Sequence, residues 1–265
     1  MTFRITTKYC AALSLILLVC AQSVFAASRL AARTKSSGNT WIIFVGILGI
    51  FGVIAAIGVY LDKVRSDKIA AFAGSLGLTY RSKPTASDLS LPSGCHLMGI
   101  GHGHTIRNIL EAVQTPELGF TLFDLQYTVG SGRNSSTYQQ TVSRMQSSLL
   151  CLPSFILFPE TIFSKLGETI MGRKDIDFSD SPVFSEAFVL RGDDDTAIRA
   201  LFSPKLRQAL EATAKLTIEG NADRLFIFRA GHRLKPEEFS ATIEQDKKIL
   251  ALFFEAQEAG VAAES

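Results

Sequence analysis

An uncharged apolar run near the N-terminus constrains this chain more than any other feature. Trp41–Leu61 contains no Asp, Glu, Lys, Arg or His and is almost entirely aliphatic, aromatic or glycine. A helix over these 21 residues measures ~31 Å at ~1.5 Å per residue, close to the ~30 Å hydrocarbon core of a bilayer. Trp41 and Tyr60 lie near its two ends, where amphipathic rings favour the membrane interface. The run therefore predicts a transmembrane helix at Trp41–Leu61.

The residues before this run have the pattern of an export signal. Residues 1–26 combine a basic start, Arg4 and Lys8, with the apolar stretch Ala11–Val19 and small residues that end at Ala26. This order is typical of a signal peptide with cleavage after Ala26, followed by a short basic linker at 27–40. Three alternatives stay open: an uncleaved first membrane helix, a lipoprotein anchored at Cys20, and an organelle transit peptide.

Counting membrane crossings gives the expected topology. After cleavage the new N-terminus lies outside, and the span at 41–61 returns the chain to the cytoplasm. An uncleaved first helix would form a hairpin with this span and leave the remainder on the same side. Basic residues flank the span on both sides, so charge does not decide the orientation. We expect a single-pass protein of the cell inner membrane with a cytoplasmic domain at 62–265; without signal or hairpin, the domain would face outward.

The net charge of the chain is misleading. Residues 1–61 hold five of the 27 Lys and Arg and none of the 25 Asp and Glu, so residues 62–265 carry a net charge of −3. This mildly acidic segment has no basic run, which argues against nucleic acid as a partner. Its length suits one ordinary domain with a core of its own.

Short strands and helices alternate along residues 62–265. Gly119–Val129 alternates in the manner of a half-buried strand, and Pro236–Gln257 carries an apolar helical stripe of Phe239, Ile243, Leu250, Phe253 and Phe254. We expect an α+β fold with an antiparallel sheet covered by helices on one side. Further expected strands are Leu78–Arg81, Ser136–Met145, Leu152–Phe158, Asp175–Phe178, Phe184–Leu190, Lys215–Glu219 and Arg224–Arg229; further helices are 62–77, 159–168 and 194–213 with a break near Pro204.

Several short motifs occur in order along the chain. They are Phe123–Tyr127 with Gly130–Gly132, Leu152–Glu160, Asp175–Phe178, Phe184-Ser185 and Leu190–Asp193. On these motifs, residues 65–255 resemble a family of uncharacterised bacterial membrane-anchored proteins. The resemblance implies membrane attachment and a shared domain; it implies no activity, substrate or catalytic residue.

Three of the four histidines lie close together near a cysteine. Cys95, His96, His102 and His104 occur within ten residues, and imidazole and thiolate are natural zinc ligands. His102 and His104 would share one face of a strand. This pattern makes His102, His104 and Cys95 a candidate metal site, although the spacing matches no established zinc motif. Ordinary loop or strand histidines are the alternative.

Acidic residues supply the other candidate chemistry. Asp175 and Asp177 alternate, so both carboxylates would point to one side, either for acid–base work or as a solvated strand face. Asp193, Asp194 and Asp195 precede a helix, where capping is the simplest function. The sequence contains no phosphate-binding glycine loop, dinucleotide fingerprint or nucleophile elbow, so it predicts no cofactor.

Together these patterns favour a binding or scaffold module at the lipid bilayer, with a protein or lipid-linked molecule as its partner. The alternative is a metal-assisted hydrolase that uses His102, His104 and nearby acids. A structural subunit of a larger membrane complex is a third hypothesis.

Overall fold

The computed structural model describes residues 40–85, 87–90, 93, 95–112, 117–161, 175–213 and 215–264. The chain divides into two compact units, Met1–Asp67 and Lys68–Ser265. The predicted signal peptide and basic linker lie outside the described residues.

Helix α2 (Thr40–Leu76) contains the predicted span and continues beyond it. Its part Val45–Leu76 is long and apolar enough to cross a membrane, and among the described residues no other helix is. Its large apolar side chains are exposed, with Leu48 at 74% and Val59 at 72%. The helix ends at Leu76, one residue before the end of the helix expected at 62–77. Gly77 follows it with φ +68°, and the amide of Leu78 bonds back to the carbonyl of Ala73.

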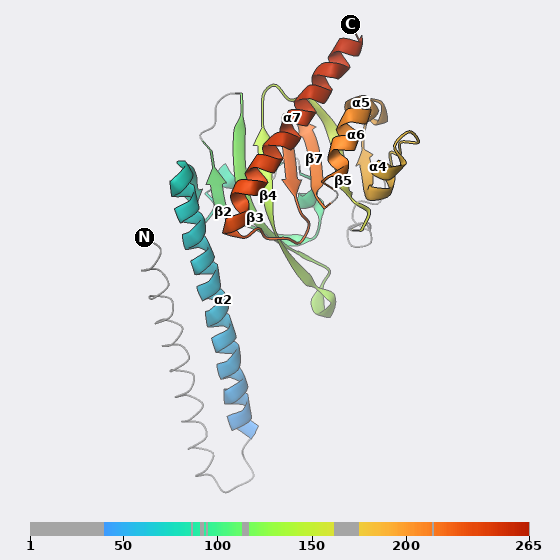
Figure 1. The fold of residues 1–265 in the computed structure, drawn as a ribbon. Coiled ribbons are helices and arrows are strands. Elements are labelled where there is room, and N and C mark those ends of the chain that lie inside the picture. Colours follow the sequence, from blue (N-terminus) through green and yellow to red (C-terminus); the bar gives the residue numbers. More distant parts are fainter. Residues whose placement is uncertain are drawn as a thin grey trace. The chain divides into compact units, whose positions relative to one another are not determined.

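The unit Lys68–Ser265 is built on one antiparallel sheet of eight strands (Figure 1). Their order across the sheet is β1-β2-β3-β4-β8-β7-β5-β6, and every neighbouring pair is antiparallel. The predicted α+β class with an antiparallel sheet is thereby confirmed. The strands are β1 (Thr79–Arg81), β2 (His102–Glu111), β3 (Gly119–Val129), β4 (Ser136–Gln146), β5 (Leu152–Pro159), β6 (Phe188–Gly192), β7 (Thr217–Ala222) and β8 (Arg224–Phe228).

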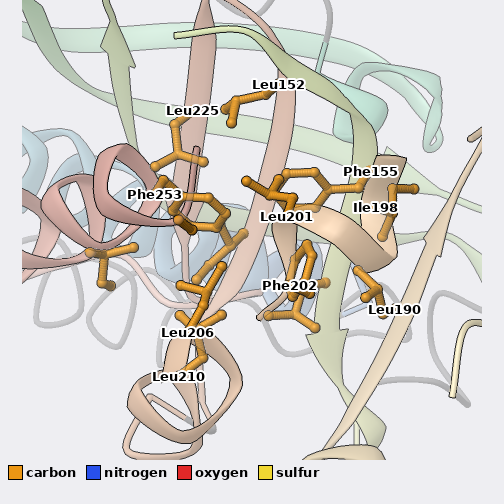
Figure 2. Close-up of a cluster of buried hydrophobic side chains, with 14 of the residues drawn as sticks. Leu152, Phe155, Leu190, Ile198, Leu201, Phe202, Leu206, Leu210, Leu225 and Phe253 are labelled. Carbon is orange, nitrogen blue, oxygen red and sulfur yellow. The ribbon is translucent and has the colours of Figure 1, made fainter. Parts of the chain in front are cut away.

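One face of the sheet carries the α-helices and the larger core. Helices α4 (Pro182–Ala187), α5 (Asp195–Leu201), α6 (Pro204–Glu211) and α7 (Phe239–Glu264) all lie on this face, and α7 crosses the strands (Figure 1). Figure 2 shows how Phe155 from the sheet packs between residues of α5 and α7. The Phe155 ring lies 5.0 Å from that of Phe202 and 5.6 Å from that of Phe253. The prediction that helices cover one side of the sheet is confirmed.

The opposite face is covered by irregular chain. A 3-10 turn at His96–Gly99 brings Leu97 and Ile100 onto a second apolar cluster with Phe123, Tyr127 and Phe226. All five side chains are at most 3% exposed. The centre of the sheet is therefore buried on both sides, in line with the apolar residues 225–228 of β8.

One expected strand is only partly correct, and another is wrong. Phe184–Leu190 begins as helix α4, and strand β6 starts only at Phe188. Pro182 occupies the first turn of this helix, where proline is well tolerated, and Phe184 is buried against the rings of Phe178 and Phe188. The segment Asp175–Phe178 forms no strand, although it does alternate between exposed and buried side chains.

The helix expected at 159–168 is not tested beyond its start. Strand β5 runs through Pro159, and residues 162–174 lie outside the described part of the chain. The break in the helical segment 194–213 is confirmed, because α5 ends at Leu201 and α6 begins at Pro204. The expected strands Lys215–Glu219 and Arg224–Arg229 are present as β7 and β8, which pair as a hairpin, and β7 continues to Ala222.

Candidate functional site

The structure places the histidine- and cysteine-rich segment across a turn and the start of β2. Cys95 is buried, and burial beside Glu219 raises the pKa of its thiol well above the usual range. His104 stacks on Tyr127 with 5.9 Å between ring centroids, and its Nε2 lies 3.0 Å from the carbonyl oxygen of Ile100. His102 is exposed at the first position of the strand.

Cys95, His102 and His104 therefore contact different neighbours and do not form a common ligand-binding site. Among the described residues, no group of three or more His, Cys, Asp or Glu side chains is arranged to hold a metal ion. A metal site at His102, His104 and Cys95 stays a prediction from the sequence, which the contacts of these three residues do not support.

The acids that the sequence singled out lie on the surface and contact basic or backbone groups. Asp175 pairs with the buried guanidinium of Arg191, and the Asp177 carbonyl accepts a bond from Arg199. The side chain of Asp194 caps α5 by accepting the amide of Ala197 at 3.0 Å, which confirms the capping prediction. Asp193 is exposed in the same turn. The hydrolase hypothesis gains no support from this arrangement.

A pocket that sequence reasoning missed lies between α7 and the sheet. Its cavity volume is about 420 Å³, within the range typical of small-ligand sites. Strands β4 and β8 form its base, the β8–α7 connection forms one wall, and the first turns of α7 form the other. Its lining residues are Thr141, Ser143, Leu216, Ile227, Phe228, Arg229, His232, Leu234, Glu237, Glu238, Ala241, Thr242, Gln245 and Asp246.

Asp246 is the unusual residue of this pocket. It is 1% exposed on α7, and its Oδ2 accepts a short hydrogen bond from the hydroxyl of Ser143 on β4. Its Oδ1 has no hydrogen-bond partner among the described residues. Burial raises the pKa of Asp246 to about 7, and the hydrogen bond from Ser143 offsets only part of that rise. A carboxyl group with an unused oxygen thus lines the pocket and changes charge near neutral pH.

The wall opposite α7 is held firmly to the sheet. Backbone bonds join the Thr141 amide to the His232 carbonyl at 3.1 Å, and the Thr141 hydroxyl accepts the amide of Leu234 at 3.0 Å. Asp124 adds an ion pair to Arg233 at 3.0 Å, while the Gly231 amide donates to the buried Gln140. These bonds fix a connection that would otherwise be a free loop, so the pocket is preformed.

Acids predominate at the rim. Glu238 Oε2 lies 3.8 Å from His232 Nε2 and accepts a hydrogen bond from the amide of Lys235. Glu237 pairs with Lys68 at 3.0 Å, and a backbone hydrogen bond, together with this pairing, lowers the pKa of Glu237. Arg229 is exposed and is the only arginine or lysine of the lining. The pocket therefore has three carboxyl groups, one guanidinium and one imidazole.

A second buried acid lies on the other face of the sheet. Glu219 is 1% exposed, and its Oε2 accepts a hydrogen bond from the His96 amide. The same oxygen lies 3.6 Å from His96 Nδ1. Its Oε1 has no hydrogen-bond partner among the described residues, and the bond from the His96 amide holds the 3-10 turn on the sheet. The pocket of Asp246 is the better candidate for a binding site.

Comparison of the chain with protein-family models, with curated proteins and with solved structures finds no match.

Proposed function

We propose that this chain is a membrane-attached binding module, in which helix α2 holds the chain in the bilayer and the α7 pocket binds a partner near the membrane. The observation that carries the proposal is the exposure of the large apolar side chains between Val45 and Leu61. In water such a surface would be costly, since each buried apolar side chain gains ~1.5–3 kcal/mol when it leaves water. A lipid environment removes that cost.

The second support comes from the unit Lys68–Ser265. Its sheet is packed on both faces, and its described residues contain a preformed pocket. A rigid pocket with a few polar groups is the usual form of a binding site. In the proposed arrangement the protein crosses the inner membrane once, and this domain lies in the cytoplasm. A protein that resides in or on the same membrane would be the natural partner.

A reporter fused after Ser265 tests both the span and the topology. Alkaline phosphatase is active only outside the cytoplasm, so the wild-type fusion should be inactive. The double variant Leu48→Arg/Phe51→Arg places two charges in the hydrocarbon core, which raises the free energy of inserting the helix into the membrane by ~5–7 kcal/mol. Loss of the span should let the domain pass outward and activate the reporter, whether or not the first segment is cleaved.

The matched control places the same two charges elsewhere. Leu118 and Leu149 are exposed in the domain, so Leu118→Arg/Leu149→Arg should leave the reporter inactive. An active wild-type fusion would reject the cytoplasmic placement. An inactive Leu48→Arg/Phe51→Arg fusion, with the protein produced at normal level, would reject α2 as the span.

A further inference from the structure

We propose that the α7 pocket binds a primary alkylammonium group, with Asp246 as its counter-ion. The inference rests on the proposed binding function and names the chemistry of the ligand. The same group occurs on a free small amine and on the lysine side chain of a protein partner, so the shared chemistry is an ammonium with N–H donors on a short apolar chain.

The first argument is the unused oxygen of Asp246. A polar atom buried without a partner costs ~1–3 kcal/mol, and more when it is charged. Oδ1 of Asp246 is in this position among the described residues, while Oδ2 is already bonded to Ser143. Because Asp246 itself lines the cavity, a small rotation of its side chain would bring Oδ1 to a donor that enters from solvent.

The second argument is the sign of the charge. Asp246, Glu237 and Glu238 line the pocket with a single guanidinium, that of Arg229, and the imidazole of His232. An anionic ligand would meet repulsion at the rim and at the base. A cation with N–H groups would instead form a charge-assisted hydrogen bond, which is roughly twice as strong as a neutral one.

The third argument is the shape and polarity of the lining. The lining also contains the apolar residues Leu216, Ile227, Leu234 and Ala241. These can pack against a short methylene chain, while the hydroxyl of Thr242 offers a further acceptor. An alkylammonium with about four to six carbons could place its charge beside Asp246 and its methylene groups against the apolar residues.

The test is a titration of the full-length protein in nonionic detergent at about pH 8, where a primary amine is protonated. Ligand-observed saturation-transfer NMR gives the dissociation constants. The probes are n-butylamine, its N,N,N-trimethyl derivative, 1-butanol and N-acetyl-lysine N-methylamide. We expect butylamine to bind at least about tenfold more tightly than the trimethyl derivative, which has the charge but no N–H, and than the uncharged alcohol.

Two variants on the same helix complete the design. Asp246→Asn keeps the size of the side chain but removes the charge, and should weaken butylamine binding about tenfold or more. Glu244→Gln removes an exposed charge that pairs with Lys247 and should leave binding unchanged. Tighter binding of the lysine derivative than of butylamine would point to a protein partner, and the reverse order to a free amine.

The proposal is overturned if butanol or the trimethyl derivative binds as well as butylamine, if Asp246→Asn binds butylamine like the wild type, or if no amine binds. Circular dichroism of the variant excludes unfolding as the cause of a lost signal. The reporter fusion is independent of this titration. A failed titration with the expected reporter pattern would therefore reject the ammonium ligand and leave the membrane attachment in place.

Discussion

Replacing Asp246 with Asn should abolish a pH-dependent loss of stability that the wild-type protein carries. Burial in the pocket raises the pKa of Asp246 from 3.8 to about 7. Between these two pH values the folded state keeps a proton that the unfolded state has released. The free energy of unfolding therefore falls as the pH rises from about 4 to about 7, and stays at its reduced value above that range.

The size of the effect follows from the two pKa values. With 3.8 for the unfolded and about 7 for the folded chain, linkage gives a destabilisation of ~1.7 kcal/mol at about pH 5 and ~4 kcal/mol at about pH 8. Between about pH 5 and pH 8, the free energy of unfolding of the wild type should therefore fall by ~2.5 kcal/mol more than that of Asp246→Asn. The other charged residues of the pocket, Arg229, His232, Glu237 and Glu238, are common to both proteins, so the difference isolates Asp246.

Urea unfolding of the full-length protein in nonionic detergent, followed by circular dichroism at several pH values, measures this difference. Glu244→Gln is the matched control, because Glu244 lies exposed on the same helix and its bond from Lys247 lowers its pKa away from the interval. The control should keep the wild-type slope. If the difference in unfolding free energy between the wild type and Asp246→Asn is constant from about pH 5 to pH 8, Asp246 is not a buried carboxyl group with a raised pKa.

Two further predictions test the packing. Phe155→Ala should cost ~3–5 kcal/mol, because the ring is fully buried between α5 and α7, whereas Val183→Ala at a 61% exposed site should change stability by less than ~0.5 kcal/mol; urea melts compare the two. Gly101→Ala should destabilise by more than the ~1–2 kcal/mol of a left-handed alanine, because its Cβ would collide with the Thr128 carbonyl. Gly103→Ala, with φ +68° in open space, should show only the conformational cost, and an equal loss in both variants would contradict this account.

Much of the fold could be predicted where one local pattern decided the structure. The alternation of Gly119–Val129 identified β3, the proline at 204 identified the break between α5 and α6, and Gly77 marked the end of α2. The strand expected at Phe184–Leu190 failed because tertiary contacts outweighed the local pattern. A buried aromatic side chain such as Phe184 is compatible with a helical turn as well as with a strand, and Pro182 favours the helix.

The candidate site could not be predicted in the same way. Its base comes from Ser143 on β4 and Ile227 on β8, which pair in the sheet although they lie far apart in sequence. Its acid, Asp246, reaches Ser143 from a helix more than 100 positions further along the chain. Sequence proximity instead drew attention to His102 and His104, which the fold places at the start of a strand with separate neighbours.

One sequence feature could have pointed to the pocket. The buried positions of α7 include Phe239, Ile243, Asp246, Leu250 and Phe253, spaced alternately by four and three residues. An amphipathic helix of this kind normally has apolar residues at every such position, and leucine at 246 would remove the cost of burying a carboxyl group. An acid that interrupts the stripe therefore lowers stability without improving the packing. Such a residue is best explained by what it contacts from outside the chain. If Asp246→Leu were more stable than the wild type and still bound butylamine equally well, that explanation would fail; greater stability with lost binding is the result we expect.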